Sequence, residues 1–369
     1  MSARIALRQL IRPLAVVVTA AALAVPVGLV SAQGAAAHPR GGEHVSWQDT
    51  PTGSTAQFRG LAPVSRKVAW VSGTEGTVLR TTDGGRTWDD VSPAGDLSAL
   101  QFRDIEAFDA QHAVILSIGD TTGAFRIYRT SNGGRTWQLG FTNTDPAAFY
   151  DCMGFWDARH GIAMSDPVDG KFRIITTKDG GRSWSVVDPA GMVPALDGEF
   201  GFAASGTCLV TAGSRDAWIA TGGGAQSRVL RTHDGGRTWR AATTAVPSGP
   251  SAGIYSLAVR GRSQLLAVGG DYALPDAGVV SATSFDAGHR FLAGGANGGY
   301  RSGSAWLPRT WASAIAVGPT GSDVSTDAGR HWRTFDTTSL DSVACTRDGA
   351  CWGSGAAGRV TKLVSQPGR

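Results

Sequence analysis

The chain has 369 residues, of which 17% are charged, and it carries a formal net charge of +4. Residues 1–37 hold three of the arginines and no acid, so the remaining 332 residues carry a charge of only +1. With no run of Lys and Arg along the chain, this balance excludes the broad basic surface of a nucleic-acid-binding protein.

The N-terminus has the pattern of an export signal. Three arginines precede an apolar stretch over residues 14–30, and a triplet of alanines before His38 offers a cleavage site. A retained transmembrane anchor is the alternative, for which the apolar run is barely long enough. We therefore expect a signal peptide at 1–37 and a secreted, monomeric, single-domain protein over 38–369.

Short runs of Val, Ile, Thr and aromatic residues, separated by Gly, Asp and Pro, dominate the rest of the chain and predict an all-β fold. The four cysteines suit disulfides in an exported protein, because no C-x-x-C motif occurs. Cys345 and Cys351 flank a hairpin turn, so a cross-strand bridge is expected there. Cys152 and Cys208 occupy equivalent places in neighbouring repeats, and a bridge between them requires a local irregularity.

One string of eight residues recurs along the chain. Thr81–Trp88 (TTDGGRTW) returns in nearly the same form at 130–137, 177–184 and 232–239, and two weaker copies lie at 284–291 and 325–332. The strings match the Asp-box signature, S/T-x-D-x-G-x-T-W. Its central residues are Asp83, Asn132, Asp179, Asp234, Asp286 and Asp327.

The Asp box is a hairpin turn. Its Asp accepts hydrogen bonds from the backbone of the turn, its Gly supplies a positive φ, and its aromatic residue packs between sheets. These roles explain every fixed residue of the string, so the six acids and amides are interpreted as structural and not catalytic.

The spacing of 41 to 55 residues between boxes is that of four-stranded propeller blades. In the second repeat we expect strands at 102–108, 113–118, 125–129 and 136–141. Three further strands follow the last box, at 341–345, 351–354 and 359–363. The segment 45–51 resembles the strand after a box Trp, and it would complete this last blade. The prediction is a seven-bladed β-propeller closed by an N-terminal strand, which leaves no free sheet edge.

The boxes resemble those of sialidases and other BNR-repeat proteins. With the runs Val68–Gly73 and Gly76–Thr81, the chain is more similar to the photosystem II assembly-factor-like (WD40/YVTN/BNR-like) propellers, and specifically to exported actinobacterial homologues. The resemblance implies a seven-bladed scaffold over nearly the whole mature chain. Members of that set often carry the label oxidoreductase.

Strand order places the boxes on one face of the propeller and the starts of the first strands on the other, where we expect the functional site. One aligned position at the start of each first strand is polar in every blade: Arg59, Arg103, Asp151, Thr207, Tyr255, Ser304 and Asp341. Neighbouring loops add Asp104, Asp166, Glu199, Asp271, Tyr300 and Arg301. Arginines beside carboxylates and tyrosines suit an anionic or polyhydroxylated ligand. For each acid alone, a turn-capping role is the alternative.

The sequence is compatible with three kinds of function. A binding or scaffold module, for a carbohydrate or anionic ligand or for an extracellular or envelope protein, is our first interpretation. A sialidase-like glycoside hydrolase that uses the same face is the alternative, and the sequence leaves open whether the protein is an enzyme. The weaker alternative is an oxidoreductase with a non-Rossmann cofactor, because the G-x-G-x-x-G string at 353–358 precedes a strand instead of opening a helix. No cofactor is predicted, and the histidines and acids lack the spacing of a metal site.

Overall fold

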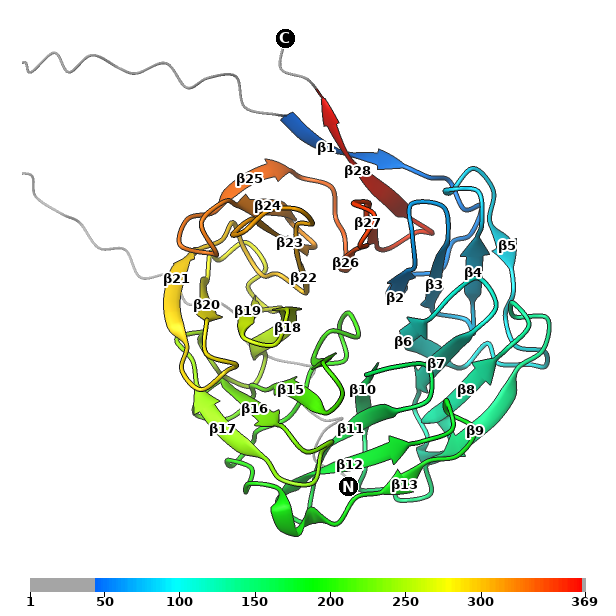
Figure 1. The fold of residues 1–369 in the computed structure, drawn as a ribbon, viewed down its shortest axis with the longest axis horizontal. Coiled ribbons are helices and arrows are strands. Elements are labelled where there is room, and N and C mark those ends of the chain that lie inside the picture. Colours follow the sequence, from blue (N-terminus) through cyan, green and yellow to red (C-terminus); the bar gives the residue numbers. More distant parts are fainter. Residues whose placement is uncertain (1–43, 367–369) are drawn as a thin grey trace, which may run out of the picture. The chain divides into compact units, whose positions relative to one another are not determined.

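The computed structural model describes residues 44–366, and the predicted signal peptide lies outside the described residues. These residues form seven antiparallel sheets of four strands each, arranged as the blades of a ring (Figure 1). The seven-bladed β-propeller predicted from the repeats is therefore confirmed.

The strands follow one another from the inner to the outer edge of each blade. Blade 1 holds β2 (Phe58–Pro63), β3 (Ala69–Gly73), β4 (Val78–Thr81) and β5 (Asp89–Asp90). Blade 2 holds β6 (Gln101–Ala107), β7 (Ala113–Ile118), β8 (Arg126–Thr130) and β9 (Gln138–Thr142). Blade 3 holds β10 (Tyr150–Phe155), β11 (Gly161–Val168), β12 (Lys171–Thr177) and β13 (Ser185–Val186). Blade 4 holds β14 (Leu209–Ala212), β15 (Asp216–Ala220), β16 (Arg228–Thr232) and β17 (Arg240–Thr243).

Blade 5 holds β18 (Ala252–Arg260), β19 (Gln264–Asp271), β20 (Val280–Ser284) and β21 (Leu292–Ala296). Blade 6 holds β22 (Gly303–Trp306), β23 (Ala314–Gly318), β24 (Gly321–Ser325) and β25 (Arg333–Asp336). Blade 7 holds β26 (Ser342–Cys345), β27 (Cys351–Ser354), β28 (Val360–Gln366) and β1 (His44–Asp49). Two single 3₁₀ turns, η1 (Thr122–Ala124) and η2 (Pro189–Gly191), lie in connections.

The N-terminal strand closes the ring as predicted. β1 pairs antiparallel with β28 along its whole length, with Trp47 opposite Leu363. Trp47 also donates a hydrogen bond from its Nε1 to Ser322 Oγ of blade 6, 2.9 Å away. The pairing covers the β28 edge, which would otherwise be open to another chain (Figure 1).

The core lies between the blades, because each sheet packs against its neighbours through both faces. The second strands β3, β7, β15 and β23 are buried along their whole length, which explains why apolar and small residues dominate them. Tryptophans fill the spaces between blades. Trp88 of blade 1 meets Trp352 of blade 7 edge-on, with ring centroids 6.1 Å apart.

Each box string folds as a turn between the third and fourth strands, here called a box turn. In blade 1, Asp83 Oδ1 accepts hydrogen bonds from the backbone N–H groups of Arg86 and Thr87, each at 3.0 Å. These bonds, with one from the Thr87 hydroxyl, lower the pKa of Asp83 to about 2. The turn thus stabilises Asp83 as a carboxylate, which agrees with a structural role for this acid.

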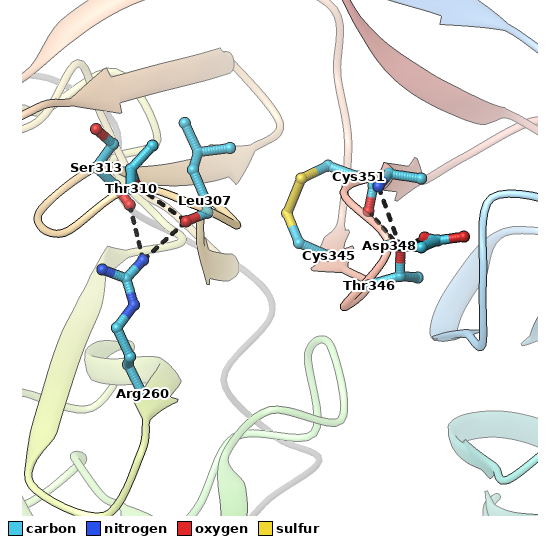
Figure 2. The surroundings of a disulfide bond; sticks show 9 residues. Arg260, Leu307, Thr310, Ser313, Cys345, Thr346, Asp348 and Cys351 are labelled. Carbon is cyan, nitrogen blue, oxygen red and sulfur yellow. Dashed lines mark hydrogen bonds between the residues drawn. A yellow bond between two sulfur atoms is a disulfide. The ribbon is translucent and has the colours of Figure 1, made fainter.

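Two disulfides are present, and they join the predicted pairs. Cys345 and Cys351 lie directly opposite each other on β26 and β27 and close the hairpin of blade 7 (Figure 2). Cys152 on β10 joins Cys208, which precedes β14, so this bridge links blades 3 and 4. The irregularity expected for it is a shift in strand register between Tyr150 and Cys152. Over residues 44–366, no helix has the length and apolar character to cross a membrane.

Candidate functional site

The face opposite the box turns is called the ring face here. It carries the starts of the first strands and the turns between second and third strands. A pocket of about 440 Å³ opens on this face. Its lining includes four of the predicted ligand-binding residues, Arg59, Tyr255, Tyr300 and Asp341.

In four blades, the aligned polar residue lies at an irregularity of the backbone. Arg59, Arg103, Asp151 and Tyr255 each stand at a shift in register between the first and second strands. In blade 1, for example, Phe58 pairs with Gly73 and Gly60 with Ser72, which leaves Arg59 as the extra residue. Such β-bulges bend a strand and redirect a side chain. Because of the bulges, these four side chains do not follow the regular alternation in which successive residues point to opposite faces of the sheet.

Arginines supply the positive charge of the pocket. Arg59 lines it, and its Nε lies 3.9 Å from Asp341 Oδ1. Arg103 lies beside the lining residue Ala203 and donates from Nη1 to its carbonyl oxygen at 2.8 Å. Burial, reinforced by the positive charge of Arg59, lowers the pKa of Arg103 to about 10, so the guanidinium remains charged at neutral pH. Two neighbouring cations are thus held where solvent screening is weak.

Aromatic rings form one wall of the pocket. Tyr255 stacks on Phe202, with centroids 3.9 Å apart, and meets Tyr300 edge-on at 4.7 Å. The Tyr255 hydroxyl donates to the carbonyl of Ser251 at 2.7 Å, and burial raises the pKa values of both Tyr255 and Tyr300. Both phenols are therefore neutral at physiological pH. Their role in the pocket is packing and hydrogen bonding, because neither is poised to act as a phenolate nucleophile.

The remaining ring positions, Thr207 and Ser304, belong to a chain of hydroxyl groups. Thr207 Oγ1 lies 2.6 Å from Ser205 Oγ and donates to Ser256 Oγ at 2.7 Å. Ser256 Oγ lies 2.9 Å from Ser304 Oγ. These bonds link blades 4, 5 and 6 across their inner strands, which satisfies the buried hydroxyls and ties the blades together.

Three of the predicted acids are grouped between blades 2 and 3 and do not line the pocket. Asp104 Oδ2 accepts a hydrogen bond from the backbone N–H of Met153 at 2.7 Å, and burial raises the pKa of Asp104 to about 7. Burial and the adjacent Asp166 carboxyl raise the pKa of Asp151 well above its ordinary value. Asp166 Oδ1 in turn accepts from the N–H of Gly201 at 2.8 Å. Burial thus disfavours the charged form of Asp151, so this carboxyl offsets the charge of nearby Arg103 less than an exposed carboxylate would.

Other predicted residues lie away from the pocket. Glu199 is buried in an ion pair with Arg228, and its Oε1 also accepts from the Thr221 hydroxyl at 2.6 Å. Arg301 is fully buried, and its Nε donates to Asp323 Oδ2 at 2.8 Å. Asp271 Oδ1 accepts from the N–H two residues on, at Ala273, which is the turn-capping alternative considered for the acids. These side chains hold loops of the ring face in place.

Eight of the residues that line the pocket were not predicted from the sequence, and the largest of their side chains are Gln57, Phe202 and Tyr272. Gln57 Nε2 donates to Asp341 Oδ2 at 2.9 Å and so orients that carboxylate. Phe202 comes from the segment between η2 and β14, which reaches toward the middle of the ring (Figure 1). The available signal was the distance of 55 residues between the boxes of blades 3 and 4, the longest in the chain. An insertion of this length must lie on one face of the propeller.

The G-x-G-x-x-G string lies in the turn between β27 and β28, as the sequence context indicated, and its Ala356 lines the pocket. Among residues 44–366, no group of three or more His, Cys, Asp or Glu side chains is arranged to hold a metal ion.

No family model and no curated protein matches the sequence. Solved structures, in contrast, match over most of the chain. A YCF48 protein bound to a D1 peptide aligns with a TM-score of 0.61 and 15% identity over 87% of this chain and 97% of its own. YCF48 from Cyanidioschyzon merolae gives a TM-score of 0.59 with 15% identity, over 86% and 98% of the two chains.

A glycoside hydrolase is also similar in fold. The GH74 xyloglucanase from Xanthomonas campestris aligns with a TM-score of 0.59 and 14% identity, over 86% of this chain and 53% of its own. At such identities the likeness establishes the propeller architecture alone, because function depends on site residues and not on fold.

Proposed function

We propose that this chain is an exported binding module whose ring-face pocket holds an anionic ligand, either a peptide or a small acid with an aromatic or apolar part. The box strings support its assignment to the Asp-box (BNR) propellers similar to the photosystem II assembly-factor-like family. Two observations carry the proposal: Arg59 lines the pocket beside a wall of aromatic rings, and Arg103 donates to the carbonyl of the lining residue Ala203.

The charge balance of the pocket favours an anion. Arg59 has a partial counter-ion in Asp341, at 3.9 Å, whereas burial raises the pKa of Asp151, an acid near Arg103, and so disfavours its charged form. A carboxylate placed between the two guanidinium groups would form charge-assisted hydrogen bonds in half-buried surroundings, where such bonds are strong. The stacked rings of Phe202 and Tyr255 would contact an apolar or planar part of the same ligand.

A peptide ligand is consistent with the fold neighbours, since one of them was solved with a peptide bound. The glycoside hydrolase alternative has less support. Hydrolysis by acid and base or nucleophile needs two carboxyl groups on either side of the scissile bond. Among the described residues that line the pocket, Asp341 is the only acid, and Asp104 and Asp151 are buried and do not line it.

Thermal unfolding with a set of ligands tests the proposal. The set contains N-acetylphenylalanine, its uncharged amide, a sialoside and a xyloglucan oligosaccharide. A ligand that binds only the folded chain stabilises it by about 2.7 kcal/mol at about 100 times its Kd. We expect the acid to raise the unfolding midpoint and the amide not to. A shift with the glycans alone, accompanied by cleavage products, would replace the binding module with the hydrolase.

A further inference from the structure

A groove of about 530 Å³ lies on the box-turn face between blades 3 and 4, remote from the ring-face pocket. Its wall on the blade 4 side includes Ser214 and Gly235, and its wall on the blade 3 side includes Thr176. Comparison of the blades shows why this boundary is open.

The residue before each box string is an arginine in three blades: Arg80, Arg129 and Arg231. Arg80 crosses from blade 1 to blade 2, where its Nη1 donates to the carbonyls of Ala110 at 3.0 Å and Gly133 at 2.9 Å. Arg129 likewise crosses to blade 3 and donates from Nε to the carbonyl of Gly180 at 3.1 Å. In blade 3 the same position is Thr176, which is too short to cross.

Backbone hydrogen bonds establish which residues correspond. The Gly133 N–H donates to the carbonyl of Gln111 at 2.9 Å, and the Gly235 N–H donates to that of Arg215 at 3.0 Å. Ser214 and Gly235 of blade 4 therefore occupy the places of Ala110 and Gly133 of blade 2. Their carbonyl groups form the same pair of acceptors that binds the Arg80 guanidinium.

Gly235 directly follows the central Asp of its box turn. In the other five box turns, the carbonyl of the equivalent residue accepts a hydrogen bond from a side chain of the preceding blade. Besides Arg80 and Arg129, the donors are Trp218 Nε1 to Ala287, Thr283 Oγ1 to Ala328 and Lys362 Nζ to Gly84. For Gly235, no hydrogen bond from a side chain of blade 3 is found within the described part of the chain. Gly235 lines the groove, and its carbonyl group lacks the side-chain donor that the equivalent carbonyl groups have in the other box turns.

The equivalent residues Gly133 and Gly235 differ in the space around them. A Cβ added to Gly133 would lie 2.1 Å from Arg80 Nη1, whereas a Cβ added to Gly235 would meet no atom within 4 Å. The volume that a guanidinium fills between blades 1 and 2 is open between blades 3 and 4.

The charges at the groove include both signs. Asp157 and Asp234 line it, and hydrogen bonds from neighbouring backbone groups outweigh burial and lower the pKa of each, so both are ionised at neutral pH. Lys178, Arg215 and Arg237 also line it, and their side chains, like that of Asp157, are exposed at the rim. Charges in water are screened over about 8 Å at physiological ionic strength. Asp234 is engaged by its own box turn, which leaves the carbonyl groups of Ser214 and Gly235 as the candidate acceptors in the interior of the groove.

We infer that this groove binds an arginine side chain of a partner protein, whose guanidinium donates to the carbonyls of Ser214 and Gly235 as Arg80 does to their counterparts. The partner's arginine completes a contact that the chain makes internally at other blade boundaries. This binding is independent of the ring-face pocket.

The probe is the capped tripeptide Gly-Arg-Gly, compared with the same peptide carrying citrulline, which has the same shape without the charge, and with Gly-Glu-Gly. Amide chemical shifts of the purified chain report the position, and the titration gives the affinity. We expect shifts at Gly235 and Arg215 with the arginine peptide, and binding at least about tenfold weaker with citrulline, since hydrogen bonds from a charged donor contribute about 1.5–3 kcal/mol.

Thr176→Arg restores the residue that blades 1, 2 and 4 carry at this position. We expect it to fill the groove, keep or raise the unfolding midpoint and weaken the arginine peptide at least about tenfold. Thr176→Val, which removes the hydroxyl without filling the space, is the matched control and should bind as the unmodified chain does.

Two results would overturn the inference. One is equal affinity for the arginine and citrulline peptides in the unmodified chain, a comparison that stands even if Thr176→Arg unfolds. The other is binding of Gly-Glu-Gly in preference to Gly-Arg-Gly, which would mean that the cations of the rim and not the carbonyls determine what the groove accepts.

Discussion

The residue after the central Asp or Asn of each box turn needs a left-handed backbone, with φ from 61° to 84° across the six turns. Four turns have Gly at this place, whereas Ala287 and Ala328 adopt φ values of 62° and 61°. A Cβ is disfavoured in this conformation, so the two weaker box strings are also the more strained turns.

This difference predicts opposite effects for two substitutions at equivalent positions. Ala287→Gly should raise the free energy of unfolding by about 0.5–1 kcal/mol, because relief of the strained φ exceeds the added chain entropy. Gly235→Ala should lower it by about 1 kcal/mol, although the new methyl group meets no atom within 4 Å. Urea denaturation measures both, and a loss of stability in Ala287→Gly would refute the backbone explanation.

Asp104 gives the ring face a dependence on pH. Its pKa is raised from 3.8 to about 7 in the folded chain, so the folded state favours the neutral carboxyl. The stability that this group contributes is fully present below pH 4 and is lost as the pH rises toward 7 and above, by at most about 4 kcal/mol.

Asp104→Asn keeps an oxygen that can accept from the Met153 N–H but cannot ionise. We expect this variant to gain stability relative to the unmodified chain as the pH rises from 4 to 8, in chemical denaturation at each pH. Asp109→Asn is the control, because hydrogen bonds from Gln111 and His112 outweigh burial and lower the pKa of Asp109. That variant should show no such gain, because the stability that a lowered pKa contributes is present above about pH 4 and is lost only as the pH falls below it. Parallel curves for Asp104→Asn and the unmodified chain would contradict the raised pKa.

At the scale of elements, the two disulfides constrain the chain to different extents. The Cys152–Cys208 bridge spans 56 residues and joins blades 3 and 4, whereas Cys345–Cys351 spans 6 residues within one hairpin. The loss of loop entropy in the unfolded chain is larger for the longer loop, about 4 kcal/mol against about 2 kcal/mol.

Replacing both cysteines of one bridge by alanine, in two separate variants, tests this order. The Cys152→Ala, Cys208→Ala variant should lose more free energy of unfolding than the Cys345→Ala, Cys351→Ala variant. Calorimetric or urea unfolding under non-reducing conditions measures the two losses. A larger loss for the hairpin variant would mean that native contacts around Cys345, and not chain entropy, set the effect.

Strand positions were predictable because local patterns determine them. The four strands expected in the second repeat lie within two residues of β6 to β9, and the closing strand was recognised from the likeness of Trp47 to a box Trp. Turn chemistry and apolar runs are local properties, so a repeat that recurs six times specifies its own boundaries.

For the whole molecule, the candidate site was predictable only in part. Aligning the blades grouped Arg59, Tyr255 and Asp341, and these three residues line one pocket, since topology alone brings the starts of the first strands together. Glu199 could not be distinguished from them, because its partner Arg228 lies 29 residues away in the chain and the ion pair exists only after blade 4 has folded. Phe202 was missed because no periodic pattern positions an insertion.

The central claim is that the ring-face pocket binds an anion through Arg59 and Arg103. Calorimetric titration of N-acetylphenylalanine into the purified chain, into Arg103→Gln and into Arg330→Gln tests it most directly, because Arg330 is an exposed arginine of a box turn. We expect saturable binding to the unmodified chain, unchanged binding to Arg330→Gln and at least about tenfold weaker binding to Arg103→Gln. Equal affinities for all three proteins would contradict it.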